Sequence, residues 1–353
     1  MSLLEETISA IKPADQEWRQ KARERLASLT MPHWALGRLM DLAADLAAIA
    51  RSLSPAVTRR AIVVMAADHG VAAEGVSLYP QEVTVQMVGN FVRGGAGINA
   101  LARVANAQVV VVDMGVAGDL TAWRDKVLNK RIRPGTSNLG REPAMSRDEA
   151  RRCLEAGVEV AQSLASEIDV FGTGDMGIAN TTPSTAIAAV FTGLPVAQLA
   201  GRGTGIGDAA WRRKVAIVEN ALRLHQPQAE DGLDVLAKVG GFEIGGLAGL
   251  ILAAAAQGKP VVVDGFISTA AALIAQSLCK RCADYMILAH RSAEAGHRAM
   301  CRRLGREPLL DLGMRLGEGT GAALAMPLLE AAARLLTDVA TFEDAGVSRA
   351  NIG

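Results

Sequence analysis

Short runs of β-branched and other apolar residues alternate with long alanine-rich stretches through the middle of the chain. This alternation is typical of parallel strands that are covered by helices on both faces of a sheet. We therefore expect an α/β fold with one open parallel sheet. Strands are predicted at residues 61–67, 107–113, 168–171, 260–264 and 285–289, with a weaker candidate at residues 196–199.

The two ends of the chain follow a different pattern. Before Ser54 and after Arg298, Leu, Ala, Arg and Glu recur every three or four residues, which indicates helices. We expect the two ends to pack together as a small helical domain formed by residues 1–53 and 299–353. Residues 54–298 then form the α/β catalytic domain.

Composition narrows the choice of partners. The chain has 353 residues, 50% of them hydrophobic, so it can bury one large core or a core with a small second domain. Lys plus Arg and Asp plus Glu are balanced at 37 each, so no overall field would hold a nucleic acid or an anionic membrane. Any phosphate that the protein binds must therefore be held by local groups.

The N-terminal segment and the cysteines favour a cytoplasmic protein. The first residues contain acids and lack the regions of a secretory signal, and the longest apolar run, residues 247–256, is too short to span a bilayer. Cys153, Cys279, Cys282 and Cys301 do not form a disulfide framework. The pair at 279 and 282 is spaced like half of a zinc site, but no second ligand pair follows, so we expect small apolar fillers and no metal.

Polar residues follow each of the five predicted strands. In open α/β sheets, ligands bind beyond the carboxyl ends of the strands. A single Asp at such a position is more often the cap of the next helix. Because five strand ends share this character, we expect a binding site there. The five strand ends are Asp68-His69-Gly70, Asp113-Met114-Gly115, Gly172-Thr173-Gly174-Asp175, Asp264-Gly265 and His290-Arg291-Ser292.

Glycine clusters indicate where a phosphate can be held, because glycine lets a backbone approach it and point N–H groups at it. The most informative cluster is residues 201–207, where Asp208 is predicted to cap a helix that carries Lys214 near its first turns. Free N–H groups, a helix dipole and an ammonium suit a phosphomonoester. A tight turn with a surface lysine is the alternative.

Residues 172–177 fit the pattern GxGxxG, which would indicate an NAD-dependent oxidoreductase. In a dinucleotide site the helix opens inside the motif, whereas here Thr182 and Pro183 predict a later helix start. The acid expected about 20 residues further on is also absent from residues 192–202. The context therefore disfavours an oxidoreductase.

Seven ordered segments resemble the nicotinate-nucleotide:dimethylbenzimidazole phosphoribosyltransferase family, which acts in cobalamin assembly. The match runs from about residue 30 to about residue 345. The resemblance implies a Rossmann-like sheet, a homodimer, and neither metal nor cofactor. The segments are AADHGVAAEGVSLYPQEVTVQMV, GTGDMGIANTTPSTA, GRGTGIGD, KVGGFEIGGLAG, VVVDGFISTAAAL, ILAHRSAEAGH and RLGEGTGAALA.

The activity implied by this resemblance is a pentosyl transfer. Ribose 5-phosphate would move from nicotinate mononucleotide to 5,6-dimethylbenzimidazole, giving nicotinate and alpha-ribazole 5′-phosphate for the nucleotide loop of cobalamin. The partners would then be small molecules alone, with no nucleic acid and no membrane. A nucleotide-binding protein without catalysis is the competing class.

The resemblance also implies roles for individual residues. Glu318, in RLGEGTGAALA, corresponds to the base that removes the benzimidazole N–H proton, and Gln86, in VTVQMV, to a contact for that ring. Asp175 stands where glutamate is usual and Ala179 where glycine is usual, so the reach of the shorter carboxylate is an open question. The residues expected to bind substrates are Ser77, Gln86, Gly174, Asp175, Gly177, Gly203, Lys214, Asp264, Ser292 and Leu316.

The chemistry needs one base. The ring nitrogen of nicotinate mononucleotide is quaternary, so nicotinate leaves the ribose C1′ with its electrons and needs no acid. Benzimidazole attacks through one nitrogen, and the product stays cationic unless the other nitrogen loses its proton. A carboxylate about 3 Å from that N–H contributes roughly 10²–10⁴ in rate. The glycines beside Glu318 let a loop place it against a flat ring.

Alternatives stay open at this point. Without the resemblance, Glu318 would be read as a solvated turn residue. His69 and His290 lie at strand ends and are alternative bases, because histidine titrates near neutral pH. Asp68 and Asp264 are candidates for holding the ribose hydroxyls or for fixing loop geometry.

The acceptor pocket should be apolar, because the benzimidazole ring is largely apolar. Methionine adapts to aromatic shapes, although any single methionine is more often an ordinary core residue. Candidate walls are Met87, Met176, Met314 and residues 78–80.

Overall fold

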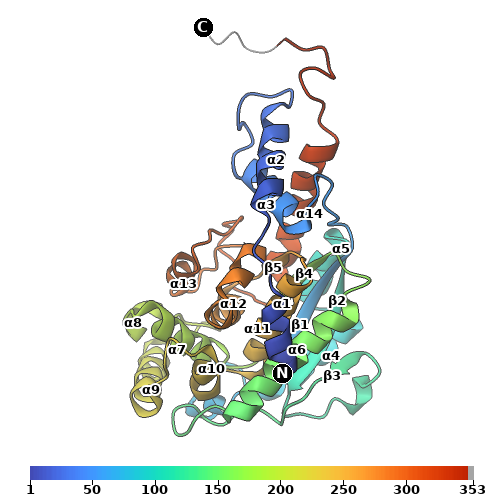
Figure 1. The fold of residues 1–353 in the computed structure, drawn as a ribbon. Helices are drawn as coiled ribbons and strands as arrows, with labels where there is room; N and C mark the ends of the chain where they lie inside the picture. Colours follow the sequence, from blue (N-terminus) through green and yellow to red (C-terminus); the bar gives the residue numbers. More distant parts are fainter. Residues whose placement is uncertain (349–353) are drawn as a thin grey trace.

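The computed structural model describes residues 1–348, and a six-stranded parallel sheet lies at its centre (Figure 1). The strand order is β3-β2-β1-β4-β5-β6, and each neighbouring pair is parallel. This is the Rossmann order, which reverses between β1 and β4. The predicted α/β fold with a Rossmann-like sheet is confirmed. The strands are β1 Arg60–Ala67, β2 Ala107–Gly115, β3 Val127–Asn129, β4 Val170–Met176, β5 Val261–Val263 and β6 Met286–Leu288.

Helices cover both faces of this sheet, which explains why its central strand β1 is apolar after its first residue, Arg60. Ile62 and Val64 of β1 point into a core shared with α3, α4, α5 and α14, whereas Val63 and Met65 point into a core shared with α6, α7, α11 and α12. The helices are α1 Leu3–Ala10, α2 Gln16–Ala27, α3 Arg38–Ala50, α4 Glu82–Arg93, α5 Gly97–Val104, α6 Arg147–Leu164, α7 Thr181–Thr192, α8 Val196–Leu199, α9 Asp208–His225, α10 Gly232–Val239, α11 Phe242–Ala256, α12 Phe266–Leu278, α13 His297–Leu304 and α14 Thr320–Thr337.

Helices from near both ends of the chain, α2, α3 and α14, form a projection at the top of Figure 1, while the N-terminus itself lies on the body. Helices α2, α3 and α14 pack against one another, and Leu29 forms a β-bridge with Thr341. In contrast, α1 packs against α6 and α11, and α13 packs against α7 and α12. The domain division at residues 53 and 298 stays a prediction, and these contacts show that not every terminal helix joins the projection.

Two edge segments differ from the predicted strands. Residues 196–199 form helix α8, which packs against α7 and α9, so the weaker strand candidate was wrong. A short apolar run does not by itself distinguish a strand from a buried helical turn. The pattern also missed β3. This strand has three residues, as β5 and β6 do, but only Val127 is buried in it, so no apolar run marks it.

Strand β4 extends further than predicted, and this bears on the GxGxxG motif. The strand contains the first two glycines of the motif, and a Cβ on Gly172 would lie 2.5 Å from the Cδ1 of Ile62. Gly172 therefore serves close packing rather than a phosphate turn. Helix α7 has Asn180 as its N-cap, beyond the motif, which also departs from a dinucleotide site. Helix α9 is capped by Gly207, and the predicted cap, Asp208, is its first residue.

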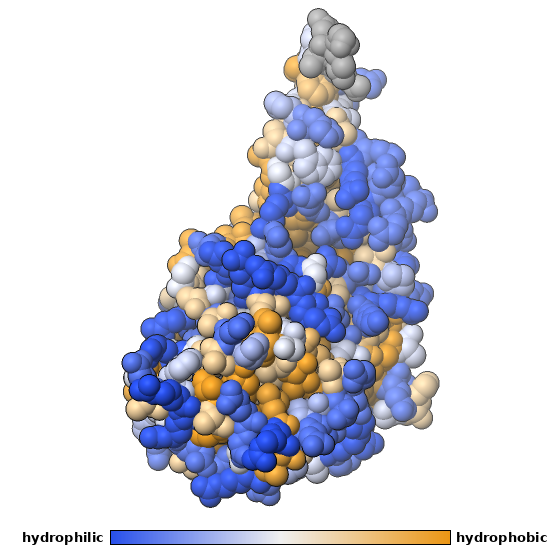
Figure 2. Space-filling view, turned by 90° about the vertical axis from the view of Figure 1, so that its left-hand side faces the viewer, coloured by the Kyte–Doolittle hydropathy of each residue, from blue (hydrophilic) through white to orange (hydrophobic). Residues whose placement is uncertain are grey.

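The surface is mixed in character. On the face drawn in Figure 2, hydrophobic residues are grouped on the lower body and hydrophilic residues surround them. Within residues 1–348, the large apolar residues that are at least half exposed are Met1, Leu78, Tyr79, Val104, Leu224, Leu312 and Leu316. None of the helices within residues 1–348 combines the length and the apolar character needed to cross a bilayer.

Candidate active site

A cavity of about 610 Å³ lies beyond the carboxyl ends of the strands. Its walls come from the segments after β1, β4, β5 and β6 and from the turn before α14. Open α/β sheets bind ligands at this edge, and the volume is usual for a small-molecule site. Of the residues expected to take part, those that line the cavity are Asp175, Gly177, Gly203, Ser292, Leu316 and Glu318.

Glu318 lies on a turn that glycines make possible. Gly317, Glu318 and Gly319 have φ angles of +83°, +63° and +91°. For a residue with a side chain, this conformation costs roughly 1–3 kcal/mol and is found mostly at functional sites. The turn rests on β4, because a Cβ on Gly174 would lie 2.5 Å from the carbonyl oxygen of Glu318. Gly174 therefore lies under the turn rather than in the cavity wall.

Glu318 is 6% exposed and lines the cavity. Its Oε2 accepts a 3.0 Å hydrogen bond from the backbone N–H of Ile98 in α5. Burial raises the pKa of Glu318, and the bond from Ile98 partly opposes this shift. A base with a raised pKa accepts a proton more readily near neutral pH. Glu318 is therefore not the solvated turn residue of the alternative interpretation.

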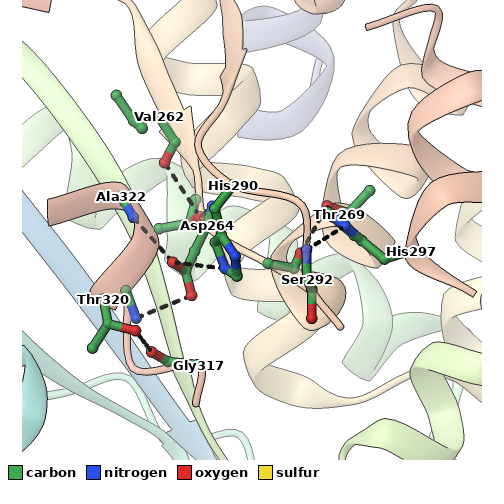
Figure 3. A network of polar contacts seen from close by, with 12 residues as sticks. Val262, Asp264, Thr269, His290, Ser292, His297, Gly317, Thr320 and Ala322 are labelled. Atoms are coloured by element: carbon green, nitrogen blue, oxygen red, sulfur yellow. Dashed lines mark hydrogen bonds and ion pairs between the residues drawn. The ribbon is translucent and has the colours of Figure 1, made fainter. Parts of the chain in front are cut away.

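Asp264 holds the Glu318 turn in place (Figure 3). Its carboxylate accepts hydrogen bonds from the N–H groups of Gly319, at 3.3 Å, and of Ala322, at 3.0 Å, at the start of α14. A carboxylate at this place stabilises a helix N-terminus. Burial raises the pKa of Asp264 to about 7, although these N–H groups oppose the shift. Asp264 does not line the cavity, so the geometry favours loop fixing over contact with ribose hydroxyls.

Asp175 lines the cavity at the end of β4. Its Oδ2 accepts a 2.9 Å hydrogen bond from the Nδ2 of Asn180, and a Cβ on Gly317 would lie 3.3 Å from both of its carboxyl oxygens. Burial raises the pKa of Asp175 well above its ordinary value, and the charge of Asp264 adds to this. A carboxyl that keeps its proton can donate a hydrogen bond to a ligand.

The loop of residues 201–207 forms another wall. Gly203 lines the cavity with a φ of +51°. The Nη1 of Arg315 donates a 2.8 Å hydrogen bond to the carbonyl oxygen of Gly203. The N–H of Leu78 donates a 3.0 Å hydrogen bond to the Oγ1 of Thr204. Groups from other segments therefore hold this loop.

Lys214 lies behind the same loop and is fully buried, so it is not the surface lysine of the alternative interpretation. Its Nζ donates hydrogen bonds to the Oγ1 of Thr181, at 2.8 Å, and to the carbonyl oxygen of Gly201, at 3.3 Å. Burial lowers the pKa of Lys214 to about 8, while the charge of Glu294 opposes this shift. Thr181 and Glu294 line the cavity, whereas Lys214 does not.

A second cavity, of about 750 Å³, adjoins the first one. The two share Gly203, Glu294 and Arg315 in their walls. Arg202 and Arg212 also line the second cavity. Asp208, which is paired with Arg202, and Glu294 are in the same wall, so the three arginines leave this end of the site with one positive charge in excess. A local excess of positive charge suits an anionic group.

Two expected substrate contacts lie outside the cavity wall. Gln86 is exposed on α4, whereas Val83 and Met87 of the same helix line the cavity. Helical residues four apart share a face, and Gln86 lies on a different one. The Oγ of Ser77 accepts a hydrogen bond from the N–H of Tyr79 and does not reach the cavity. The sequence identified the right helix but not its facing side.

The expected apolar walls are present in part. Met87, Met176 and Tyr79 line the cavity, and Met314 does not. The sequence did not single out several other lining residues, although most lie inside or beside a segment that carried the family resemblance. The available signal was therefore a position inside or beside such a segment, combined with a place just past a strand end. These residues are Asn180, Thr181, Phe266, Ile267, Glu294 and Arg315.

The alternative bases are less well placed than Glu318. His69 is buried, is hydrogen bonded to Glu243 at 2.8 Å, and does not line the cavity. Burial lowers the pKa of His69, but the charge and hydrogen bond of Glu243 and the charge of Asp68 together outweigh it, so the net shift is upward. His290 lines the cavity, but burial lowers its pKa, and its Nε2 lies 3.9 Å from Asp264.

The cysteines offer little to a metal ion. Cys279 precedes the 3₁₀ turn η3, Lys280–Tyr285, which contains the buried Cys282. Burial raises the pKa of the Cys282 thiol and so disfavours the thiolate that a metal needs. In the part of the chain that the structure describes, no three His, Cys, Asp or Glu side chains are grouped so as to hold a metal.

Comparisons with known proteins agree on one family. The family model DBI_PRT, described as phosphoribosyltransferase, matches residues 11–347. A nicotinate-nucleotide:dimethylbenzimidazole phosphoribosyltransferase of Syntrophotalea carbinolica is 61% identical over 351 residues, 99% of each chain. The enzyme of that name from Desulfotalea psychrophila is 55% identical over 351 residues, again 99% of each. A crystal structure with this name from Thermus thermophilus matches with a TM-score of 0.90 and 48% identity, covering 95% of this chain and 100% of that one.

Proposed function

This chain belongs to the phosphoribosyltransferase family whose model matches residues 11–347, and from this membership we propose how its residues carry out the transfer. It is an enzyme that moves ribose 5-phosphate from nicotinate mononucleotide to 5,6-dimethylbenzimidazole. The products are nicotinate and alpha-ribazole 5′-phosphate, used in the nucleotide loop of cobalamin.

One observation carries the assignment of the base. Glu318 is a buried carboxylate on a turn with positive φ, and it faces the same cavity as Gly203 and Ser292, the proposed phosphate contacts. An acceptor ring and a nucleotide can therefore lie side by side between them. A side chain held in this way is oriented before the substrates arrive, which is where much of the rate of a two-substrate reaction originates.

In the proposed step, a benzimidazole nitrogen attacks C1′ with its lone pair while the bond from C1′ to the pyridinium nitrogen breaks. The bonding electrons leave with nicotinate and neutralise its ring. The other benzimidazole nitrogen gives its proton to the carboxylate of Glu318, so the product ring is neutral. The raised pKa of Glu318 favours this proton transfer, which is worth roughly 10²–10⁴ in rate.

The donor is proposed to bind with its phosphate at Gly203 and Ser292. Lys214 lies behind this wall, hydrogen bonded to Thr181 and to the loop at Gly201. A phosphate dianion at the wall favours the protonated ammonium, so nucleotide binding should raise the pKa of Lys214 from about 8. Lys214 thus contributes charge to the site while its stem stays buried.

The acceptor ring is proposed to lie against Met87, Met176 and Leu316, near the carboxylate of Glu318. These side chains line the cavity and supply the apolar surface that the ring needs. Gln86 is proposed to reach this ring, and Ser77 to reach a substrate, by moving their side chains toward the cavity when the substrates bind. Asp175, with its raised pKa, is proposed to donate a hydrogen bond to a substrate oxygen.

We further propose a homodimer in the cytoplasm. Leu78, Tyr79 and Leu316 are more than half exposed, and Tyr79 and Leu316 also line the cavity. Exposed apolar groups beside a site often mark a surface that a second chain covers. Sedimentation or light scattering measures the assembly directly, and a monomer at micromolar concentration would refute the dimer.

The function is tested by incubating the protein with nicotinate mononucleotide and 5,6-dimethylbenzimidazole and identifying both products by mass. Glu318→Gln keeps the shape of the side chain and removes its basicity. We expect this variant to fold and to bind the nucleotide, but to lose kcat by roughly 10²–10⁴. Near-normal turnover would show that Glu318 is not the base, and absence of both products with the native chain would refute the function.

A further inference from the structure

The imidazole of His297 lies beside the site without lining it. His297 is the first residue of α13, is 0% exposed, and touches neither cavity. Nothing in the transfer described above uses this side chain. A buried polar ring nevertheless needs a partner for each nitrogen, because an unpaired buried group is costly.

The partners of His297 fix its protonation state (Figure 3). The backbone N–H of Ser292 lies 2.9 Å from Nδ1, and the Oγ1 of Thr269 lies 2.9 Å from Nε2. A backbone N–H can only donate, so Nδ1 must be the acceptor and Nε2 must carry the proton. The hydroxyl of Thr269 accepts that proton and donates its own to the carbonyl oxygen of Gly265, at 2.7 Å.

The surroundings keep the ring in this neutral form. Burial lowers the pKa of His297 to about 3, and the neighbouring His290 adds to the shift. The centroids of the two rings are 6.3 Å apart. A protonated ring would set an N–H against the N–H of Ser292, so the neutral tautomer and the geometry agree.

This chain of hydrogen bonds joins two loops that line the cavity. Ser292 belongs to the loop after β6 and Gly265 to the loop after β5, and both line the cavity. The loop after β6 continues to Ala293, whose N–H donates a 2.9 Å hydrogen bond to the carbonyl oxygen of Met314, just before the Glu318 turn. The backbone N–H groups of Arg291 and Ala293 are bonded to the segment before α14, and that of Ser292, between them, is bonded to the ring of His297.

We propose that His297 is a positioning residue for the donor: its neutral ring holds the backbone of Ser292 in the orientation that receives the phosphate of the nucleotide. This inference rests on the proposed function, in which Ser292 contacts the phosphate. It assigns His297 no contact with either substrate and no proton transfer. Its effect should therefore fall on nucleotide binding.

Two substitutions of similar polarity test the two ring nitrogens one at a time. In His297→Asn, the amide oxygen lies near the position of Nδ1 and can still accept from Ser292. In His297→Gln, the amide lies near the position of Nε2 and can still bond to Thr269, but the N–H of Ser292 loses its partner. Each variant keeps one of the two hydrogen bonds, so the two should be destabilised to a similar degree.

The variants are compared in the full chain by KM for each substrate, by kcat, by Tm, and by calorimetric binding of nicotinate mononucleotide. We expect His297→Gln to raise the KM and the Kd of the nucleotide by about tenfold or more. The KM of the base and kcat should change by less than about threefold, because His297 contacts neither the ring nor the reacting atoms. His297→Asn should restore the nucleotide KM to within about threefold of the native value.

If the two variants lost nucleotide affinity equally, or if the KM of both substrates rose equally, His297 would be only a packing residue and the proposal would be overturned. Should His297→Gln fail to fold, Thr269→Val removes the partner of Nε2, together with the hydrogen bond to the carbonyl oxygen of Gly265, and leaves the bond from Ser292 to Nδ1 in place. We then expect a lower Tm with an unchanged nucleotide KM, and a nucleotide KM raised by about tenfold would overturn the proposal. Absence of product with the native chain would instead refute the proposed function, so the two failures are distinguishable.

Discussion

Two walls of the same cavity are built on different principles. At the Glu318 turn, the backbone sets the position of the side chain: positive φ angles at Gly317, Glu318 and Gly319 and close contact with Gly174 leave little freedom. At the loop of residues 201–207, side chains from other segments hold the backbone, and much of the loop is exposed.

The difference matches what each wall has to do. Proton transfer needs a carboxylate placed to within a fraction of an ångström, because small errors cost large factors in rate. A phosphate can be bound by several N–H groups and by charge, which tolerates a more adaptable loop. We therefore expect changes at the Glu318 turn to lower kcat, and changes at the 201–207 loop to raise the KM of the nucleotide.

The largest effect is expected from Gly174→Ala. Its Cβ would lie 2.5 Å from the carbonyl oxygen of Glu318, and neither backbone can yield easily. We expect kcat to fall by about 10²-fold, because the base is displaced, with a loss of roughly 1–3 kcal/mol in unfolding free energy from overpacking. Steady-state kinetics and urea unfolding measure both.

Gly207→Ala is the matched control for this substitution. A Cβ on Gly207 would meet nothing within 4 Å, and this residue, with a φ of −72°, belongs to the other wall. We expect kcat and stability close to the native values. If the two alanine variants lost kcat equally, the contrast between the walls would be refuted.

Asp264→Asn should have the next largest effect. One amide oxygen cannot replace two carboxylate oxygens that accept from Gly319 and Ala322, so a buried N–H loses its partner. We expect kcat to fall by about tenfold, the size of one such loss. The KM of the nucleotide should change little, because the 201–207 loop is untouched.

The same variant tests the pH dependence of stability. The fold raises the pKa of Asp264 from 3.8 to about 7, so it favours the protonated form. The stability that Asp264 contributes is therefore fully present below pH 3.8 and is lost as the pH rises to about 7. Between pH 3.8 and about 7, the unfolding free energy of Asp264→Asn should therefore fall less than that of the native protein. The difference between the two should be a few kcal/mol at most, since one pKa unit is worth about 1.4 kcal/mol. The control is Asp125→Asn, at a side chain that is 92% exposed, and its unfolding free energy should depend on pH as that of the native protein does. If Asp264→Asn also kept the native pH dependence, the assignment to Asp264 would be contradicted.

Lys214→Met tests the other wall. The substitution keeps an apolar stem in the buried space and removes the ammonium that bonds to Thr181 and Gly201. We expect the KM of the nucleotide to rise by about tenfold, since a charge-assisted interaction is lost, while kcat changes by less than about threefold. Lys238→Ala, at a lysine paired with Asp234 outside both cavities, is the control. If Lys214→Met lowered kcat and left the KM of the nucleotide unchanged, Lys214 would act on the Glu318 turn instead.

The strand ends were predictable from the sequence because a parallel sheet brings them to one edge whatever the order of its strands. Asp175 and Ser292 were therefore identified as neighbours before any geometry was known, and both line the cavity. The loop at Gly203, which also lines it, was identified from its glycine cluster and not from a strand end. Glu318 was different: its segment is a helical one by pattern, and the family resemblance alone made it a candidate.

Residues that act through the packing of distant segments could not be predicted in this way. Gly174 needs to be glycine because the start of α14 returns to lie on β4, and Asp264 is directed at the same helix start. Gln86 was assigned to the acceptor ring by the family resemblance, and a sequence does not show which way a helix is rotated; the exposed side of α4 carries this residue. His297 shows no pattern of its own, since its partners come from separate segments.

The smallest effect is expected from Thr204→Val, which probes how firmly the adaptable wall is held. Valine keeps the shape of the side chain and removes the hydroxyl that accepts the N–H of Leu78. Both residues are exposed, so water can replace the lost hydrogen bond at little cost. We expect the KM of the nucleotide to rise by about two- to threefold and kcat to stay unchanged. A change of about tenfold or more in kcat would mean that this loop is fixed as rigidly as the Glu318 turn, and the distinction between a backbone-built wall and a side-chain-held wall would fail.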